Sequence, residues 1–88
     1  MESIWKFKLE VADSQTVKMP EDAEIICVQI QHGEICVWVK VNIEAPKEDK
    51  VFKMYGTGHE HAFIEGKYVG SVQQMNGQLV WHIFVLEN

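Results

Sequence analysis

The pentad Tyr55-Gly56-Thr57-Gly58-His59 is the segment of this sequence whose residue types and spacing best suit ligand chemistry. Glycines at alternate positions let backbone N–H groups approach an anion closely, and the residues between them supply an aromatic ring, a hydroxyl and an imidazole. Lys53, two residues upstream on the same predicted strand, could supply a positive charge. The pattern suits a nucleotide or a phosphate group, although Gly-Thr-Gly also closes many ordinary turns.

Histidines and cysteines are the side chains that could ligate a metal ion. His59 and His61 form an H-x-H pair, which on a strand would place both imidazoles on one face, where zinc could bind if a third ligand were present. Both histidines fall in a predicted loop, and neither a C-x-x-C nor an H-x-x-x-H motif accompanies them. We therefore expect no metal and no cofactor.

Catalysis would need a nucleophile with a base beside it. The residues other than tyrosine that carry hydroxyls are Ser3, Ser14, Thr16, Thr57 and Ser71. Ser71 is expected to face His82 in a hairpin, but a cross-strand pair of this kind is far more often plain surface. There is no nucleophile elbow and no pair of acids in an apolar setting. The sequence therefore predicts a binding protein and not an enzyme.

Strands must position these residues, because apolar and polar side chains alternate along most of the sequence. From Trp5 to Val11 the apolar side chains all point one way, and residues 16–19 form a short strand that Pro20 ends. The other strands are predicted at residues 24–31, 35–39, 51–55, 68–74 and 79–86. The 88 residues have room for one core, so we expect a single all-β domain over residues 1–88. Its form is a small antiparallel barrel or sandwich of about six to seven short strands.

The first predicted hairpin turns at His32-Gly33. Six aliphatic residues then share its core face as three cross-strand pairs, Ile30 with Ile35, Val28 with Val37 and Ile26 with Val39. The opposite face is mixed, with Cys27 across from Trp38 and Gln29 across from Cys36. We expect this face, through Cys27, Cys36 and Trp38, to form a subunit interface. The thiols are most simply buried and reduced, and a disulfide or half of a metal site is the alternative.

The second predicted hairpin turns at Asn76-Gly77, the pair that a type I′ turn prefers. Its core-side pairs are Val72 with Trp81, Gly70 with Ile83 and Tyr68 with Val85. Two loops complete the prediction. Residues 42–50 are expected to form a solvated loop, and residues 56–66 a long irregular loop of functional or mobile character.

Charge restricts the partners. The formal net charge is −5 and all 8 basic residues are lysines, which argues against a nucleic acid polymer, whereas a compact anion can still bind through local charge. No run of residues is apolar and long enough to span a bilayer, and the first residues do not form a signal peptide. We expect a cytoplasmic protein with no membrane partner.

The sequence resembles a family of short bacteriophage and prophage proteins that are labelled as a domain of unknown function. The pentad, together with Trp81-His82, is the most specific part of the resemblance, which covers nearly the whole chain. Further matching positions are Trp5-Lys6-Phe7, Asp13, Gln15-Thr16, Met19-Pro20, Val28-Gln29, Gln31, Trp38, Pro46, Tyr68, Gly70, Gln73, Gly77 and Leu79-Val80. The sequence departs from the family at Glu60-His61, where other members often have proline.

The resemblance implies a phage accessory protein in the cytoplasm of an infected bacterium. The protein is similar in size to phage sponges, which sequester the cyclic nucleotide signals of bacterial immunity. The resemblance to such sponges also implies a homo-oligomer. In that interpretation Tyr55 contacts a base, Gly56 and Gly58 present N–H groups, and Thr57, His59 and Lys53 contact phosphate. The alternative is a protein–protein interaction module, either an inhibitor of a host enzyme or a virion component, that uses the Cys27/Trp38 face.

Overall fold

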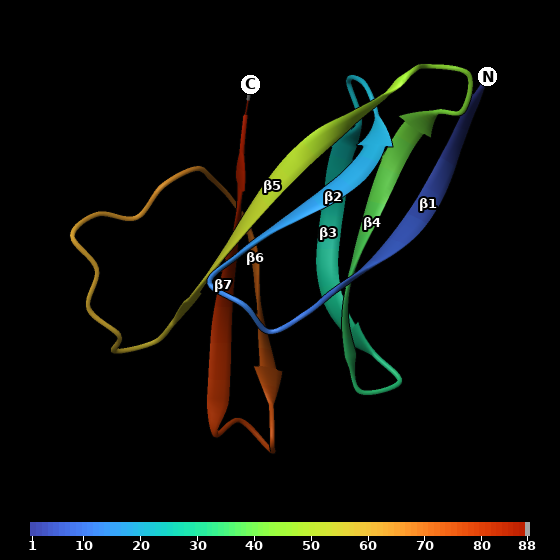
Figure 1. The fold of residues 1–88 in the computed structure, drawn as a ribbon. Coiled ribbons are helices and arrows are strands. Elements are labelled where there is room, and N and C mark those ends of the chain that lie inside the picture. Colours follow the sequence, from blue (N-terminus) through green and yellow to red (C-terminus); the bar gives the residue numbers. More distant parts are fainter. Residues whose placement is uncertain (88) are drawn as a thin grey trace.

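Seven strands in two antiparallel sheets form the protein. The computed structural model describes residues 1–87, and within them it contains strands, turns and loops but no helix. The strands are β1 (Glu2–Leu9), β2 (Ser14–Pro20), β3 (Glu24–Gln31), β4 (Glu34–Asn42), β5 (Lys47–Gly56), β6 (Lys67–Gln74) and β7 (Leu79–Leu86). One sheet has the order β1-β4-β3 and the other the order β2-β5-β7-β6 (Figure 1). The predicted all-β class is confirmed, and the two packed sheets make it a small sandwich.

The core lies between the two sheets. Strand alternation sends every second side chain inward, so β4 contributes four branched residues and β5 and β7 contribute the facing layer. The residues of these three strands that form the core cluster are Ile35, Val37, Val39, Val41, Phe52, Met54, Ile83 and Val85. None of the described residues forms a helix of the length and hydrophobicity needed to cross a bilayer.

The sheets approach most closely where β3 faces β6. A Cβ atom at Gly70 of β6 would lie 2.8 Å from Cγ1 of Val28 in β3, so only glycine fits without a shift. Such close approach is a common reason for glycine inside a strand.

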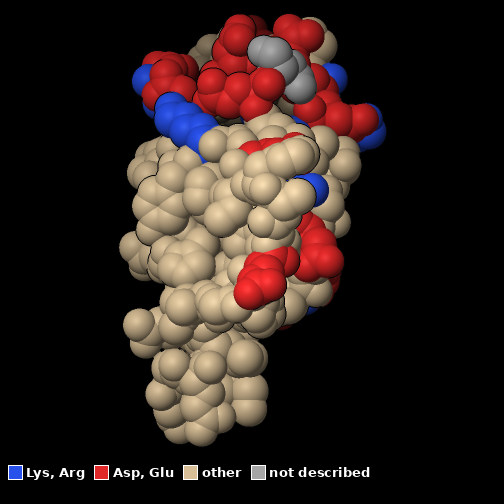
Figure 2. Space-filling model, turned by 90° about the vertical axis from the view of Figure 1, so that its left-hand side faces the viewer, with Lys and Arg blue, Asp and Glu red and all other residues tan. Residues whose placement is uncertain are grey.

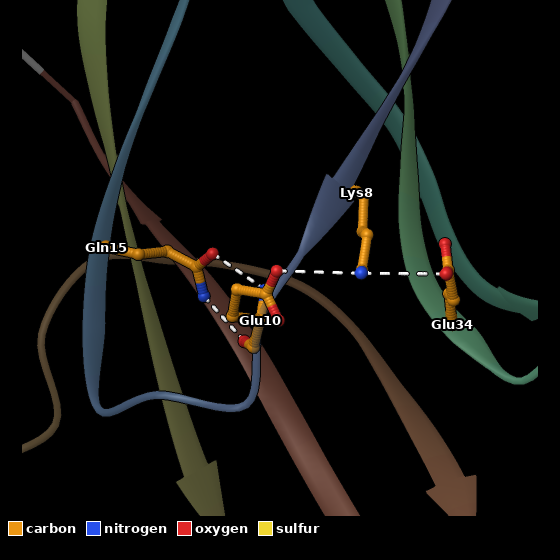
Figure 3. Close-up of polar contacts among 4 residues, drawn as sticks. All are labelled: Lys8, Glu10, Gln15 and Glu34. Carbon is orange, nitrogen blue, oxygen red and sulfur yellow. Dashed lines mark hydrogen bonds and ion pairs between the residues drawn. The ribbon is translucent and has the colours of Figure 1, made fainter.

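The corner between β1 and β2 is held by one side chain. The Gln15 amide accepts a hydrogen bond from the Glu10 N–H at 2.9 Å and donates one to the Glu10 carbonyl at 2.7 Å (Figure 3). Beside this corner Lys8 lies between Glu10 and Glu34, with nitrogen–oxygen distances of 3.6 and 3.5 Å. The charge of Glu10, followed by that of Glu34, raises the pKa of Lys8 above its ordinary value.

The register of the first hairpin is confirmed near its turn, where Ile30 pairs with Ile35 and Val28 with Val37. Farther from the turn a β-bulge follows Ile25, so that Ile25 and not Ile26 pairs with Val39. The extra residue reverses the direction of every side chain beyond it. The predicted core position of Ile26 is therefore wrong, and its side chain is 52% exposed.

The second hairpin also contains a bulge. Asn76 and Gly77 have positive φ and the Gln78 N–H donates to the Met75 carbonyl at 3.1 Å, as the predicted turn requires. Met75 has positive φ as well, so the connection between Gln74 and Leu79 is four residues long and wider than a two-residue turn. The pairing of residues 72 with 81 and 70 with 83 is also confirmed. At Val69 the ladder shifts, so Tyr68 pairs with Phe84. The predicted pair of Tyr68 with Val85 is wrong, and Tyr68 lies on the outer face of its sheet.

The predicted solvated loop 42–50 is also wrong. Strand β4 continues to Asn42 and β5 already begins at Lys47, so the connection is four residues long. The charged residues that suggested a loop lie in the ladder with β2 instead, where Lys18 forms an ion pair with Asp49 at 2.7 Å. At the end of β1, Val11 is exposed in the turn and does not continue the strand to the core.

Candidate functional site

The pentad begins at the end of β5 and is divided between the two faces of its sheet. Gly56 pairs with Trp81 on the core side, whereas Tyr55 pairs with His82 on the outer side. The turn that follows is tight, because the His59 N–H donates to the Gly56 carbonyl at 3.1 Å and the Thr57 N–H donates to the Val80 carbonyl at 3.2 Å. These two backbone donors are therefore already satisfied within the protein.

The core-side part of the pentad borders a hollow at the end of β5, which we call the His59 hollow. Its volume is about 310 Å³, and it is lined by Val11, Ala12, Asp13, Met54, Gly56, His59, His61 and Trp81. The His59 ring lies edge-on to Trp81, with centroids 6.2 Å apart. A Cβ atom at Gly56 would lie 2.7 Å from Cε1 and Nδ1 of His59, so glycine is what allows the imidazole to fold over the strand.

Tyr55 anchors the loop that follows the pentad. Its ring is 6% exposed and meets the edge of His61 at 4.8 Å and of Phe84 at 5.5 Å between centroids. Its hydroxyl accepts a hydrogen bond from the Glu65 N–H at 3.0 Å. Tyr55 therefore fastens to the sheet the long loop, which was predicted at residues 56–66 and begins at residue 57 because Gly56 still belongs to β5. In this arrangement the Tyr55 ring offers little surface for a base to stack on.

On the outer face four side chains form a continuous series of hydrogen bonds, which we call the hydroxyl–imidazole row. Thr57 Oγ1 lies 2.7 Å from His82 Nε2, and His82 Nδ1 lies 2.7 Å from Ser71 Oγ. Ser71 Oγ lies 2.7 Å from the Tyr68 hydroxyl. His82 is half-buried and the three hydroxyl residues are exposed. Cross-strand pairing predicted the Ser71–His82 contact.

Lys53 lies on this same outer face, half-buried. Its ladder partner on β7 is Phe84, whose partner on β6 is Tyr68. The structure thus places Lys53 and Thr57 on the face opposite to Gly56 and His59. Local sequence patterns did not indicate Tyr68 at this site, because only the bulge at Val69 turns it outward. They also did not indicate the contact between His61 and Tyr55.

The predicted interface residues lie on the outer face of the other sheet. A second hollow of about 320 Å³ is lined there by Ile4, Ile26, Cys27, Gln29 and Trp38, and we call these residues the Trp38 face. Cys36 is 2% exposed, so a partner on this face would meet Cys27 and Trp38 first. Both thiols are free. Within residues 1–87 no three histidine, cysteine or acidic side chains are grouped as a metal site would need.

The whole sequence can now be compared with known proteins. A family model described as a domain of unknown function, DUF7352, matches residues 1–88. The chain belongs to this family. Neither the curated proteins nor the solved structures include a significant match. Membership of an uncharacterised domain family assigns no activity, so the function of this DUF7352 domain has to be argued from its own surfaces.

Proposed function

We propose that this protein binds and sequesters a small nucleotide, of the cyclic oligonucleotide second-messenger class, without turning it over. In this proposal it is a phage accessory protein that counters immunity in the cytoplasm of an infected bacterium. The observation that supports the proposal is the His59 hollow, where Gly56 and His59 of the pentad meet His61 and Trp81.

The hollow suits a nucleobase in size and chemistry. Its volume of about 310 Å³ is at the lower end of the range for small-molecule sites. An indole and two imidazoles provide aromatic faces and edges, and stacking on such rings is a general way of holding bases. Imidazole nitrogens also provide hydrogen-bond donors for phosphate oxygens.

The remaining predicted contacts divide between the two faces of β5. In the proposal Gly56 and Gly58 present backbone N–H groups and His59 contacts phosphate, and Gly58 has open space at the position of a Cβ atom, with a φ of 83°. Thr57 and Lys53 contact a phosphate that reaches around the end of the strand. Tyr55 acts by holding the loop.

The distribution of charge favours a small ligand over a long nucleic acid. Figure 2 shows most acidic side chains of this face gathered at the end where the chain termini lie and a second group at mid-height, whereas the part farthest from the termini carries none. The His59 hollow, formed by the turn after β1 and the end of β5, lies away from the termini (Figure 1). A small anion in the hollow would lie away from the acidic end but beside Asp13 of the lining, whereas a long nucleic acid would meet the whole net charge of −5.

We also propose that the protein is a homo-oligomer assembled through the Trp38 face. Ile4 and Ile26 are exposed apolar residues beside the half-buried Trp38. The ion pair between Lys40 and Glu2, at 3.5 Å, lies at the same end of this sheet and offers both signs of charge. A patch with both charges at its rim can pair with a copy of itself.

The test is a thermal-shift and calorimetric screen against cyclic di- and trinucleotides, with Gly56→Ala and His59→Ala as site variants. At about a hundred times the dissociation constant, a ligand adds roughly 2.7 kcal/mol and raises the midpoint by about ten degrees or more. We expect one nucleotide class to do so, and each variant to bind it at least about tenfold more weakly, because one displaces His59 and the other removes it.

The matched control is His32→Asn, which changes a histidine in the β3–β4 turn, where φ is 51° and asparagine is tolerated. This variant should bind as the unchanged protein does. Equal binding by Gly56→Ala, His59→Ala and the control would remove the hollow from the proposal. A screen with no shift at all would favour the alternative, a protein–protein interaction module that uses the Trp38 face.

A further inference from the structure

The hydroxyl–imidazole row lies on the outer face of its sheet and shares only Thr57 with the proposed nucleotide site, and general hydrogen-bonding rules give it an order. Its three contacts are all 2.7 Å, and both nitrogens of His82 take part. A neutral imidazole carries one N–H and one acceptor nitrogen. Ser71 and Thr57 therefore have opposite roles, since one donates its proton to the ring and the other accepts from it.

The phenol of Tyr68 decides which hydroxyl donates. A phenol O–H is a stronger hydrogen-bond donor than an aliphatic alcohol, so Tyr68 is the better donor in the contact with Ser71. Ser71 then accepts from Tyr68 and directs its own proton to His82 Nδ1. The remaining N–H at Nε2 donates to Thr57, which fixes the plane of the ring.

We propose that Ser71 is a nucleophilic hydroxyl that accepts the acyl or phosphonyl group of an activated ester, with His82 as its base. A nucleophile within hydrogen-bond distance of a base, and a third group that orients the base, is the arrangement that activates serine in proteins. Thr57 is the positioning residue.

The step balances without a cofactor. With a fluorophosphonate, the bond between Ser71 Oγ and phosphorus forms while the phosphorus–fluorine bond breaks. Fluoride leaves with the bonding electron pair, and the hydroxyl proton passes to His82 Nδ1. The Tyr68 hydroxyl, released from Ser71, can donate to the negatively charged oxygen that develops on the ester.

The neighbourhood of Ser71 favours a donor with an apolar group. The rings of Tyr68 and Phe84 meet at a tilt of 63° with centroids 5.5 Å apart, beside the row. Tyr68 is largely exposed and Phe84 half-buried, so an alkyl or aryl group can lie against them. Ser71 itself lies exposed on the strand surface, and we therefore expect stoichiometric modification of the protein without turnover.

The test is labelling with an alkyl fluorophosphonate, followed by intact-mass measurement and peptide mapping. The chain contains its own controls, because Ser14 and Thr16 are exposed hydroxyls on β2 of the same sheet. General-base assistance is worth about a hundredfold or more, so Ser71 should be labelled at least about a hundred times faster than Ser14. Equal labelling of Ser71 and Ser14 would overturn the proposal, and needs no variant.

Variants then assign the roles. His82→Gln should reduce the labelling of Ser71 to the rate of Ser14. Thr57→Val should lower the rate of Ser71 labelling, and Thr57→Ser, which keeps the hydroxyl, should retain it. If the role of Thr57 were purely steric, Thr57→Val would be labelled faster than Thr57→Ser. Undiminished labelling in a folded His82→Gln protein would refute the role of His82. Nucleotide binding by His59 is measured separately, so either proposal can fail alone.

Discussion

Gln15 holds the corner between the two sheets with a single side chain. Its amide forms hydrogen bonds with both the N–H and the carbonyl of Glu10. It thus takes the place of a neighbouring strand's backbone at the point where β1 has ended and β2 begins. A primary amide is well suited to this, because it has a donor and an acceptor side by side. The turn after β1 also lines the His59 hollow, so this residue supports the proposed site from a distance.

Replacing Gln15 with alanine should destabilise the protein by about 1–2 kcal/mol, since two hydrogen bonds to the backbone are lost. For a domain of this size the thermal midpoint should fall by roughly 4–15 °C, measured by calorimetry. Gln78→Ala, in the exposed β6–β7 turn, is the matched control and should change stability by less than about 0.5 kcal/mol. Equal midpoints for the two variants would show that the corner does not depend on this contact.

At the scale of elements, two bulges decide which side chains reach the surface. The bulge after Ile25 brings Ile26 out to the Trp38 face, and the bulge at Val69 brings Tyr68 out to the hydroxyl–imidazole row. Each inserts one residue and so reverses the alternation beyond it. The Trp38 face and the hydroxyl–imidazole row therefore each contain one residue that only a β-bulge turns outward.

The bulge in β3 predicts an asymmetry between neighbouring isoleucines. Ile25→Thr places a hydroxyl against the core and should cost about 1–3 kcal/mol, whereas Ile26→Thr should cost less than about 0.5 kcal/mol. Threonine keeps the β-branched shape, so strand propensity is nearly equal at both positions. Urea unfolding with comparable m-values measures both. The reverse order of costs would mean that β3 pairs with β4 without a bulge.

At the scale of the whole molecule, the sandwich has two outer faces of different character. The β2-β5-β7-β6 sheet carries the hydroxyl–imidazole row and the loop of residues 57–66, whereas the β1-β4-β3 sheet carries the Trp38 face. The His59 hollow lies at the end of β5, beside the turn that joins the two sheets. A dimer through the Trp38 face would therefore leave both other surfaces free.

Sedimentation velocity should show an oligomer for the unchanged protein and a monomer for Ile4→Lys, which places a charge among the apolar residues of the Trp38 face, on its edge strand β1. A stable interface buries about 800 Å² on each partner, and a desolvated, unpaired lysine opposes such burial. Ile43→Lys, at an exposed position in the β4–β5 turn, is the control and should leave the assembly intact. A monomeric unchanged protein would contradict the proposal.

Sequence alone determined the all-β class, most of the strands and both hairpin turns, because alternation and turn residues act between neighbours in the chain. It also paired Ser71 with His82, since a tight turn fixes the register of the residues near it. It failed at residues 42–50, where a charged run that suggests a loop belongs to a strand whose partner, β2, is distant in sequence.

Only the tertiary structure decided how the pentad is used. From sequence alone the five residues were predicted to form one binding site. Strand alternation instead sends Gly56 toward Trp81 and Tyr55 toward His82. The turn then places His59 over Gly56. The hollow is formed by the turn before β2, the end of β5 with its loop, and β7, which meet only when strands distant in sequence have paired in one sheet. Bulges and packing between sheets depend on contacts distant in sequence, and for that reason local patterns do not encode them.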